Sequence, residues 1–89
     1  MKFYIDKDGD LGFSLNGKDA HVMMTQSAVD DDWSWDYVIQ NQTEALTEDY
    51  EELIYLGGIT ELSECPSGPL TEVTEDQAKD LYRNLGGKV

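Results

Sequence analysis

The chain of 89 residues carries 19 Asp and Glu residues against 6 Lys and Arg residues, giving a formal net charge of −13 at pH 7. A chain of this length buries only about 60–65% of the surface that it exposes when unfolded, so we expect a single domain over residues 1–89 with a thin core. The charge argues against direct binding to nucleic acid, because phosphate contacts require Lys and Arg side chains.

The N-terminal third has the pattern of short strands joined by tight turns. Apolar runs at Lys2–Ile5 and Leu11–Leu15 flank the turn-rich segment Asp6–Asp10, which predicts a hairpin. Asn16-Gly17 is a strong turn signal, because both residues tolerate positive φ. A third strand is therefore expected at about Ala20–Thr25.

The segment from residue 33 to residue 39 alternates between large apolar and other residues. Its large side chains at every second position are Trp33, Trp35, Tyr37 and Ile39. This period of two predicts a strand whose aromatic face contributes to the core.

Residues 47–62 fit two structures. Thr47–Glu52 resembles a helix start, with acidic residues in the first turn, and the helix would end at Gly57-Gly58. The same glycines could instead join strands at Glu52–Leu56 and Ile59–Leu62, and the β-branched residues slightly favour this hairpin.

The C-terminal segment predicts a helix. Thr74 and Gln77 form a capping-box pattern, and Ala78, Leu81, Tyr82 and Leu85 follow as one apolar stripe until Gly86-Gly87. The expected fold class is α+β, with an antiparallel sheet of four to six strands covered on one face by this C-terminal helix.

The chain offers little for catalysis or metal binding. Cys65 and His21 are the only cysteine and histidine, which excludes an internal disulfide and leaves too few ligands for zinc. Glu64 disfavours a thiolate at Cys65, so we predict no enzyme, no catalytic residues and no cofactor. With no signal peptide or long apolar run, a cytoplasmic location without a membrane span is expected.

The segment Asp6–Asp10 resembles the start of a calcium-binding EF-hand loop. The pattern fails at Leu11, where the loop needs glycine, and at Gly17, where it needs a bidentate glutamate. We therefore predict no metal site, and expect a hairpin turn in which aspartates cap backbone amides.

Between residues 19 and 78 the chain has fifteen acidic residues and no Lys or Arg. Their densest groups are Asp30, Asp31, Asp32 and Asp36, and then Glu44, Glu48, Asp49, Glu51 and Glu52. Like charges without internal partners destabilise a fold, so these nine residues are the predicted binding site for a basic partner. General solubility, or a salt-loving source, would also enrich acidic residues.

The opening residues Met1–Leu11 resemble the first hairpin of small proteins common in phage genomes. In size and acidity the whole chain resembles phage-encoded DNA-mimic inhibitors, including anti-restriction and anti-CRISPR proteins. The resemblance implies an inhibitor, acting in the host cytoplasm, that covers the nucleic-acid-binding surface of a host protein. Two alternatives are an immunity protein for a basic nuclease toxin and a structural phage component that assembles through its sheet edge.

Overall fold

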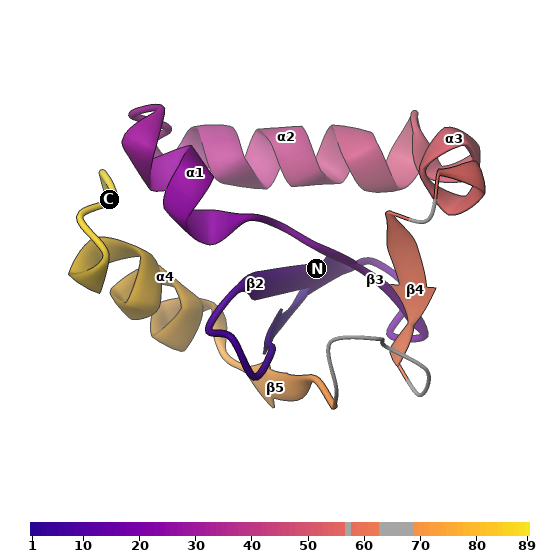
Figure 1. The fold of residues 1–89 in the computed structure, drawn as a ribbon, viewed down its shortest axis with the longest axis horizontal. Coiled ribbons are helices and arrows are strands. Elements are labelled where there is room, and N and C mark those ends of the chain that lie inside the picture. The colour runs from indigo at the N-terminus through magenta and orange to yellow at the C-terminus, as the bar shows by residue number, and fades with distance from the viewer. Residues whose placement is uncertain (57, 63–68) are drawn as a thin grey trace.

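The fold is a five-stranded antiparallel sheet combined with four helices, seen in a computed structural model that describes residues 1–56, 58–62 and 69–89 (Figure 1). In chain order the elements are β1 (Lys2–Ile5), β2 (Leu11–Ser14), β3 (Asp19–Val22), α1 (Thr25–Asp30), α2 (Trp35–Thr47), α3 (Tyr50–Tyr55), β4 (Ile59–Glu61), β5 (Thr71–Val73) and α4 (Glu75–Asn84). The predicted α+β class and antiparallel sheet are confirmed.

The strands lie in the order β4-β3-β2-β1-β5, and every neighbouring pair is antiparallel. Phe3 pairs with Phe13 and with Val73, while His21 pairs with Phe13 and with Ile59. Residues opposite each other in register share one face of a sheet, so these five side chains lie on the same face. This face carries the core.

The helices contribute to one cluster of buried side chains on that face. Trp35 of α2 stacks on Phe3 with ring centroids 6.1 Å apart and meets Tyr82 of α4 at 5.6 Å. Ala78 and Tyr82 are fully buried, as the predicted C-terminal helix requires, whereas Leu85 is 40% exposed. The Thr74 capping box is present, with both of its reciprocal hydrogen bonds formed.

Both N-terminal turns form as predicted. The Asp6 carboxylate turns inward and accepts hydrogen bonds from the backbone N–H groups of Asp8 (2.9 Å) and Asp10 (2.8 Å), so it caps amides. In the next turn Asn16 Oδ1 accepts from the backbone of Lys18, and Gly17 takes a φ of 73°. The third strand is shorter than expected, since it ends at Val22 and α1 begins at Thr25.

The strand predicted at residues 33–39 is wrong, because this segment opens α2. Ser34 is the N-cap, and its side chain accepts from Tyr37 N–H. The buried residues of the helix follow helical spacing and are Trp35, Val38, Gln42 and Leu46. Trp35 reaches the core as expected and Trp33 packs against it, whereas Tyr37 is 43% exposed.

Each interpretation of residues 47–62 is correct for one half. The expected strand at Glu52–Leu56 is wrong, because α3 occupies Tyr50–Tyr55. The expected strand at Ile59–Leu62 is confirmed over Ile59–Glu61, where it pairs with β3. Helix α1 and strand β5 were not predicted from the sequence.

Candidate partner-binding surface

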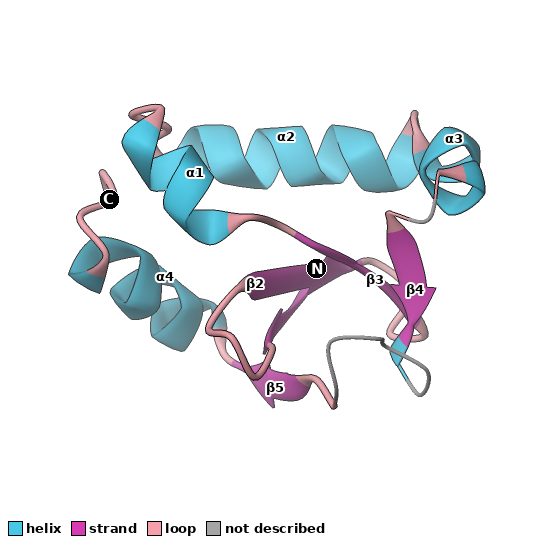
Figure 2. Cartoon of the chain, in the orientation of Figure 1, coloured by secondary structure: helices cyan, strands magenta, loops and turns pink. Residues whose placement is uncertain are grey.

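Helices α1, α2 and α3 follow one another along the chain with short turns between them (Figure 2). All nine predicted site residues lie in these helices or in the turns that join them, and all nine are exposed. We call this set the acidic layer; its members are Asp30, Asp31, Asp32, Asp36, Glu44, Glu48, Asp49, Glu51 and Glu52. The six Lys and Arg residues all lie outside residues 25–56. The layer therefore combines nine carboxylates with no basic side chain of its own.

The acidic layer has two clusters, one at each end of α2. The first cluster, Asp30 to Asp36, surrounds the turn between α1 and α2, and the second, Glu44 to Glu52, surrounds the junction of α2 with α3. Glu44 follows Asp36 by eight positions in α2, which is about 12 Å along the helix axis. The two clusters are therefore separated by less than the length of α2.

The first cluster lies on a tight helix-ending turn. The backbone N–H of Asp32 donates to Val29 O (3.0 Å) and that of Trp33 donates to Ala28 O (3.0 Å), which is the Schellman pattern. Asp32 takes the left-handed position of this motif with φ 61°, and it is the sole non-glycine residue with positive φ in the described part of the chain. An aspartate thus occupies a position where glycine is usual.

The second cluster faces away from the sheet. Glu44 follows the buried Trp35 by nine residues, about two and a half helical turns, so it lies on the opposite side of α2. Glu51 and Glu52 lie in the first turn of α3, where the helix dipole favours negative charge. These carboxylates therefore point to solvent without disturbing the core.

Few basic groups neutralise the acidic layer. Within the described ranges there are two ion pairs, Arg83–Asp80 at 2.5 Å and Lys88–Asp32 at 3.8 Å. Only the second pair involves the acidic layer. Both of its side chains are largely exposed, so the pair stabilises the fold by about a few tenths of a kcal/mol. Eight of the nine carboxylates have no described ion-pair partner.

Exposed apolar side chains border the second cluster. Ile54, Tyr55 and Leu56 are 49%, 88% and 68% exposed, and α3 has no buried residue. Exposed aromatic residues are typical anchors of protein interfaces. The sequence analysis considered Leu53–Leu56 only as part of a helix or of a hairpin strand, so it did not identify Ile54, Tyr55 and Leu56 as surface groups.

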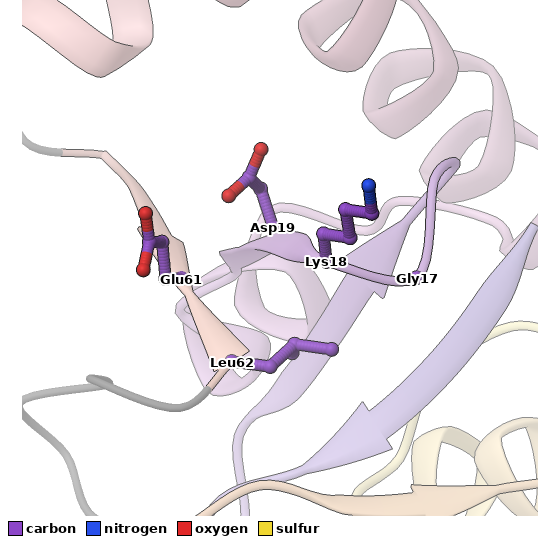
Figure 3. Close-up of a pocket in the computed structure, with 5 residues that line it drawn as sticks. All are labelled: Gly17, Lys18, Asp19, Glu61 and Leu62. Carbon is purple, nitrogen blue, oxygen red and sulfur yellow. The ribbon is translucent and has the colours of Figure 1, made fainter.

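A separate shallow pocket of about 520 Å³ lies beside the β3–β4 edge, and Asp19 and Glu61 project from neighbouring strands there (Figure 3). These two carboxylates are directly opposite in register, an arrangement that destabilises an antiparallel pair. Asp19 accepts a hydrogen bond of 2.5 Å from the hydroxyl of Tyr50, which raises the pKa of Tyr50. The Asp19 carboxylate is thus already hydrogen-bonded to Tyr50 within the fold.

Of the two residues considered for catalysis, His21 lies within the described part of the chain. His21 Nδ1 is 2.7 Å from Gln42 Oε1, whereas Cys65 and Glu64 lie outside the described residues. Over residues 1–56, 58–62 and 69–89, no group of three or more His, Cys, Asp or Glu side chains is arranged to hold a metal ion. In the same ranges, no helix has the length and apolar character needed to cross a bilayer.

The chain gave no match to a model of a known family, to a curated protein or to a solved structure, which leaves its own surface chemistry as the basis for assigning a function.

Proposed function

We propose that this chain is a non-enzymatic inhibitor whose acidic layer binds the basic nucleic-acid-binding surface of a host protein in place of DNA. The observation that carries the proposal is the segregation of charge: nine exposed carboxylates share residues 25–56 with no Lys or Arg. Such a surface attracts a basic groove from a distance and repels nucleic acid. Its place of action would be the host cytoplasm, as for phage proteins of the anti-restriction or anti-CRISPR kind.

The dimensions of the acidic layer fit a DNA mimic. The molecule is 31 Å long, and α1, α2 and α3 together run along that dimension (Figure 1). One strand of a DNA duplex carries one phosphate about every 3.4 Å of helix axis, which gives about nine phosphates over this length. The acidic layer carries nine carboxylates, so its charge per unit length is similar to that of one DNA strand and about half that of the duplex.

Capture from a bacterial lysate tests the proposal. The immobilised chain should retain basic nucleic-acid-binding proteins at about 50 mM salt and release them at about 500 mM salt, where the Debye length falls to a few ångströms. Added duplex DNA should also release them, because DNA and the chain would compete for one surface. The proposal is refuted if the chain retains no such protein at low salt.

Two quadruple variants separate the acidic layer from general acidity. One neutralises the first cluster, with Asp30, Asp31, Asp32 and Asp36 changed to Asn. The other removes the same charge elsewhere, with Asp8→Asn, Glu72→Gln, Glu75→Gln and Asp76→Asn, all exposed positions outside the layer. Capture should fall sharply for the first variant only, and an equal fall for both would indicate non-specific attraction.

An immunity protein for a basic nuclease toxin would use the same acidic layer. The identity of the captured protein distinguishes it from an inhibitor of a host protein. Assembly of a structural component through the sheet edge is less well supported, because the edge strands β4 and β5 have three residues each.

A further inference from the structure

A cavity of about 420 Å³ opens beside the first cluster, between β3, α1 and α2. Its apolar wall includes Met23, Ala28 and Trp33, of which the first two are buried. At its mouth Met24 is 74% exposed, and an exposed methionine is a flexible apolar surface that adapts to an inserted side chain. The cavity therefore suits a slender, largely apolar group.

The backbone of the α1–α2 turn holds one wall in place. The N–H of Trp33 donates to Ala28 O at 3.0 Å, and its carbonyl accepts from the hydroxyl of Tyr82 at 2.6 Å. The Trp33 ring also meets Tyr37 edge-on, with centroids 4.8 Å apart. Trp33 is thus fixed before any ligand arrives, which lowers the entropic cost of binding against it.

A chain of hydrogen bonds holds the other wall. Gln42 is buried, its Oε1 lies 2.7 Å from His21 Nδ1, and its Nε2 donates to Asn41 Oδ1 at 3.2 Å. All three residues line the cavity. Their amide and imidazole groups offer polar contacts to a ligand at a fixed position.

The charge at the cavity is negative. Asp31 lines it, while Asp30 and Asp32 are its chain neighbours. Asp30 accepts a hydrogen bond from Gln26 Nε2 at 2.9 Å and Asp32 lies 3.8 Å from Lys88 Nζ, whereas Asp31 has no described side-chain partner. The Asp31 carboxylate could therefore form an ion pair with a cationic group that enters the cavity.

We infer that this cavity receives an arginine side chain of the basic partner, an inference that rests on the proposed function and specifies its mode of recognition. The arginine stem would contact the Met23 and Met24 side chains, and its guanidinium would pair with Asp31 beside the ring of Trp33. Arginine fits better than lysine, because a planar guanidinium can both stack on an indole and donate two parallel hydrogen bonds to a carboxylate. The neighbouring acidic residues would steer the arginine to the cavity.

Titration of the free chain with small probes, followed by amide and indole NMR shifts, tests the cavity without the partner. N-acetylarginine amide should shift the signals of Asp31, Trp33 and Met24 at millimolar concentration. N-acetylcitrulline amide has nearly the same shape without the charge and should shift them at least about tenfold less, as a charge-assisted contact requires. The lysine analogue should fall between the two.

Two matched variants identify the carboxylate. Asp31→Asn should abolish the arginine-induced shifts, whereas Asp8→Asn, which removes the same charge at an exposed position outside the acidic layer and the cavity, should leave most of them. Equal shifts with citrulline, equal losses in the two variants, or shifts confined to residues outside the cavity would overturn the inference. These results are independent of lysate capture, since a chain that binds arginine amide but captures no basic protein would refute only the proposed function.

Discussion

Replacing Asp32 with glycine should stabilise the fold, because this residue holds a left-handed backbone conformation at φ 61°. The left-handed conformation costs a residue with a Cβ atom roughly 1–2 kcal/mol of folding free energy, and it costs glycine nothing. Glycine is more flexible in the unfolded chain, and ordering it lowers the stability by about 0.5–1 kcal/mol. The exposed contact with Lys88 at 3.8 Å is worth little. The net gain is about 0.5–1 kcal/mol, or a rise in Tm of about 2–8 °C for a domain of this size.

Urea unfolding of four proteins measures this prediction and separates backbone from charge. Asp32→Asn removes the charge but keeps a residue that tolerates the left-handed region, so its stability should change little. Asp31→Gly removes the same charge at a residue with φ −84°, where glycine relieves no strain and should cost about 0.5–1 kcal/mol. The prediction is refuted if Asp32→Asn raises the free energy of unfolding as much as Asp32→Gly does. It is also refuted if Asp32→Gly and Asp31→Gly change the free energy of unfolding in the same direction.

Three further changes probe other parts of the fold. Tyr82→Phe should lose about 1 kcal/mol, since the buried hydroxyl donates a 2.6 Å hydrogen bond to a backbone carbonyl. Burial raises the pKa of Tyr82 above its usual value near 10, so this stabilisation is complete below that pH; unfolding curves should show the two proteins converging as pH rises through the raised pKa. Glu61→Gln should stabilise the fold by about 0.2–1 kcal/mol, because it relieves the repulsion with Asp19, and the stabilisation should be smaller at high salt. The control Glu72→Gln on β5 should leave the stability unchanged. Thr74→Ala should lose about 1 kcal/mol in thermal unfolding, because it removes the α4 capping box.

Local signals predicted the parts of the fold that are determined locally. The Asn16-Gly17 turn, the amide-capping Asp6 and the Thr74 cap each depend on residues within four positions of one another, and all three form. The β1–β2–β3 part of the sheet followed from the two N-terminal turns, because a tight turn between two apolar runs leaves an antiparallel pair as the compact arrangement.

Helix α2 was missed because two periodicities coincide at its start. The aromatic residues alternate up to Tyr37, yet Trp35 and Val38 already follow helical spacing, and Ser34 provides the cap. The next residue of the buried stripe is Gln42, a polar side chain that breaks the apolar pattern and is buried because it pairs with His21. That pairing joins β3 to α2, so no local pattern could have indicated it.

The positions of the nine acidic residues could be predicted, whereas the surroundings of those residues could not. Counting charges was sufficient to select residues from Asp30 to Glu52, since their exposure follows from their cost of burial. The cavity beside Asp31 depends on how β3 packs near α1 and α2, and the exposure of Tyr55 depends on which face of α3 packs against the core, where Tyr50 and Leu53 lie. Both features depend on tertiary packing, so the sequence pattern alone did not reveal them.

A binding surface and a surface that serves only solubility predict different distributions of charge. Solubility requires net charge but no particular arrangement, so like charges would be spread to limit repulsion. Here nine carboxylates share residues 25–56 without one basic side chain, while all six Lys and Arg residues lie outside that segment. Neutralising the first cluster should therefore raise stability whatever the function is. The same variant should also fail to capture a basic partner, whereas the matched variant outside the acidic layer should still capture it. That combination of results would mean that the acidic layer lowers stability but is needed for binding.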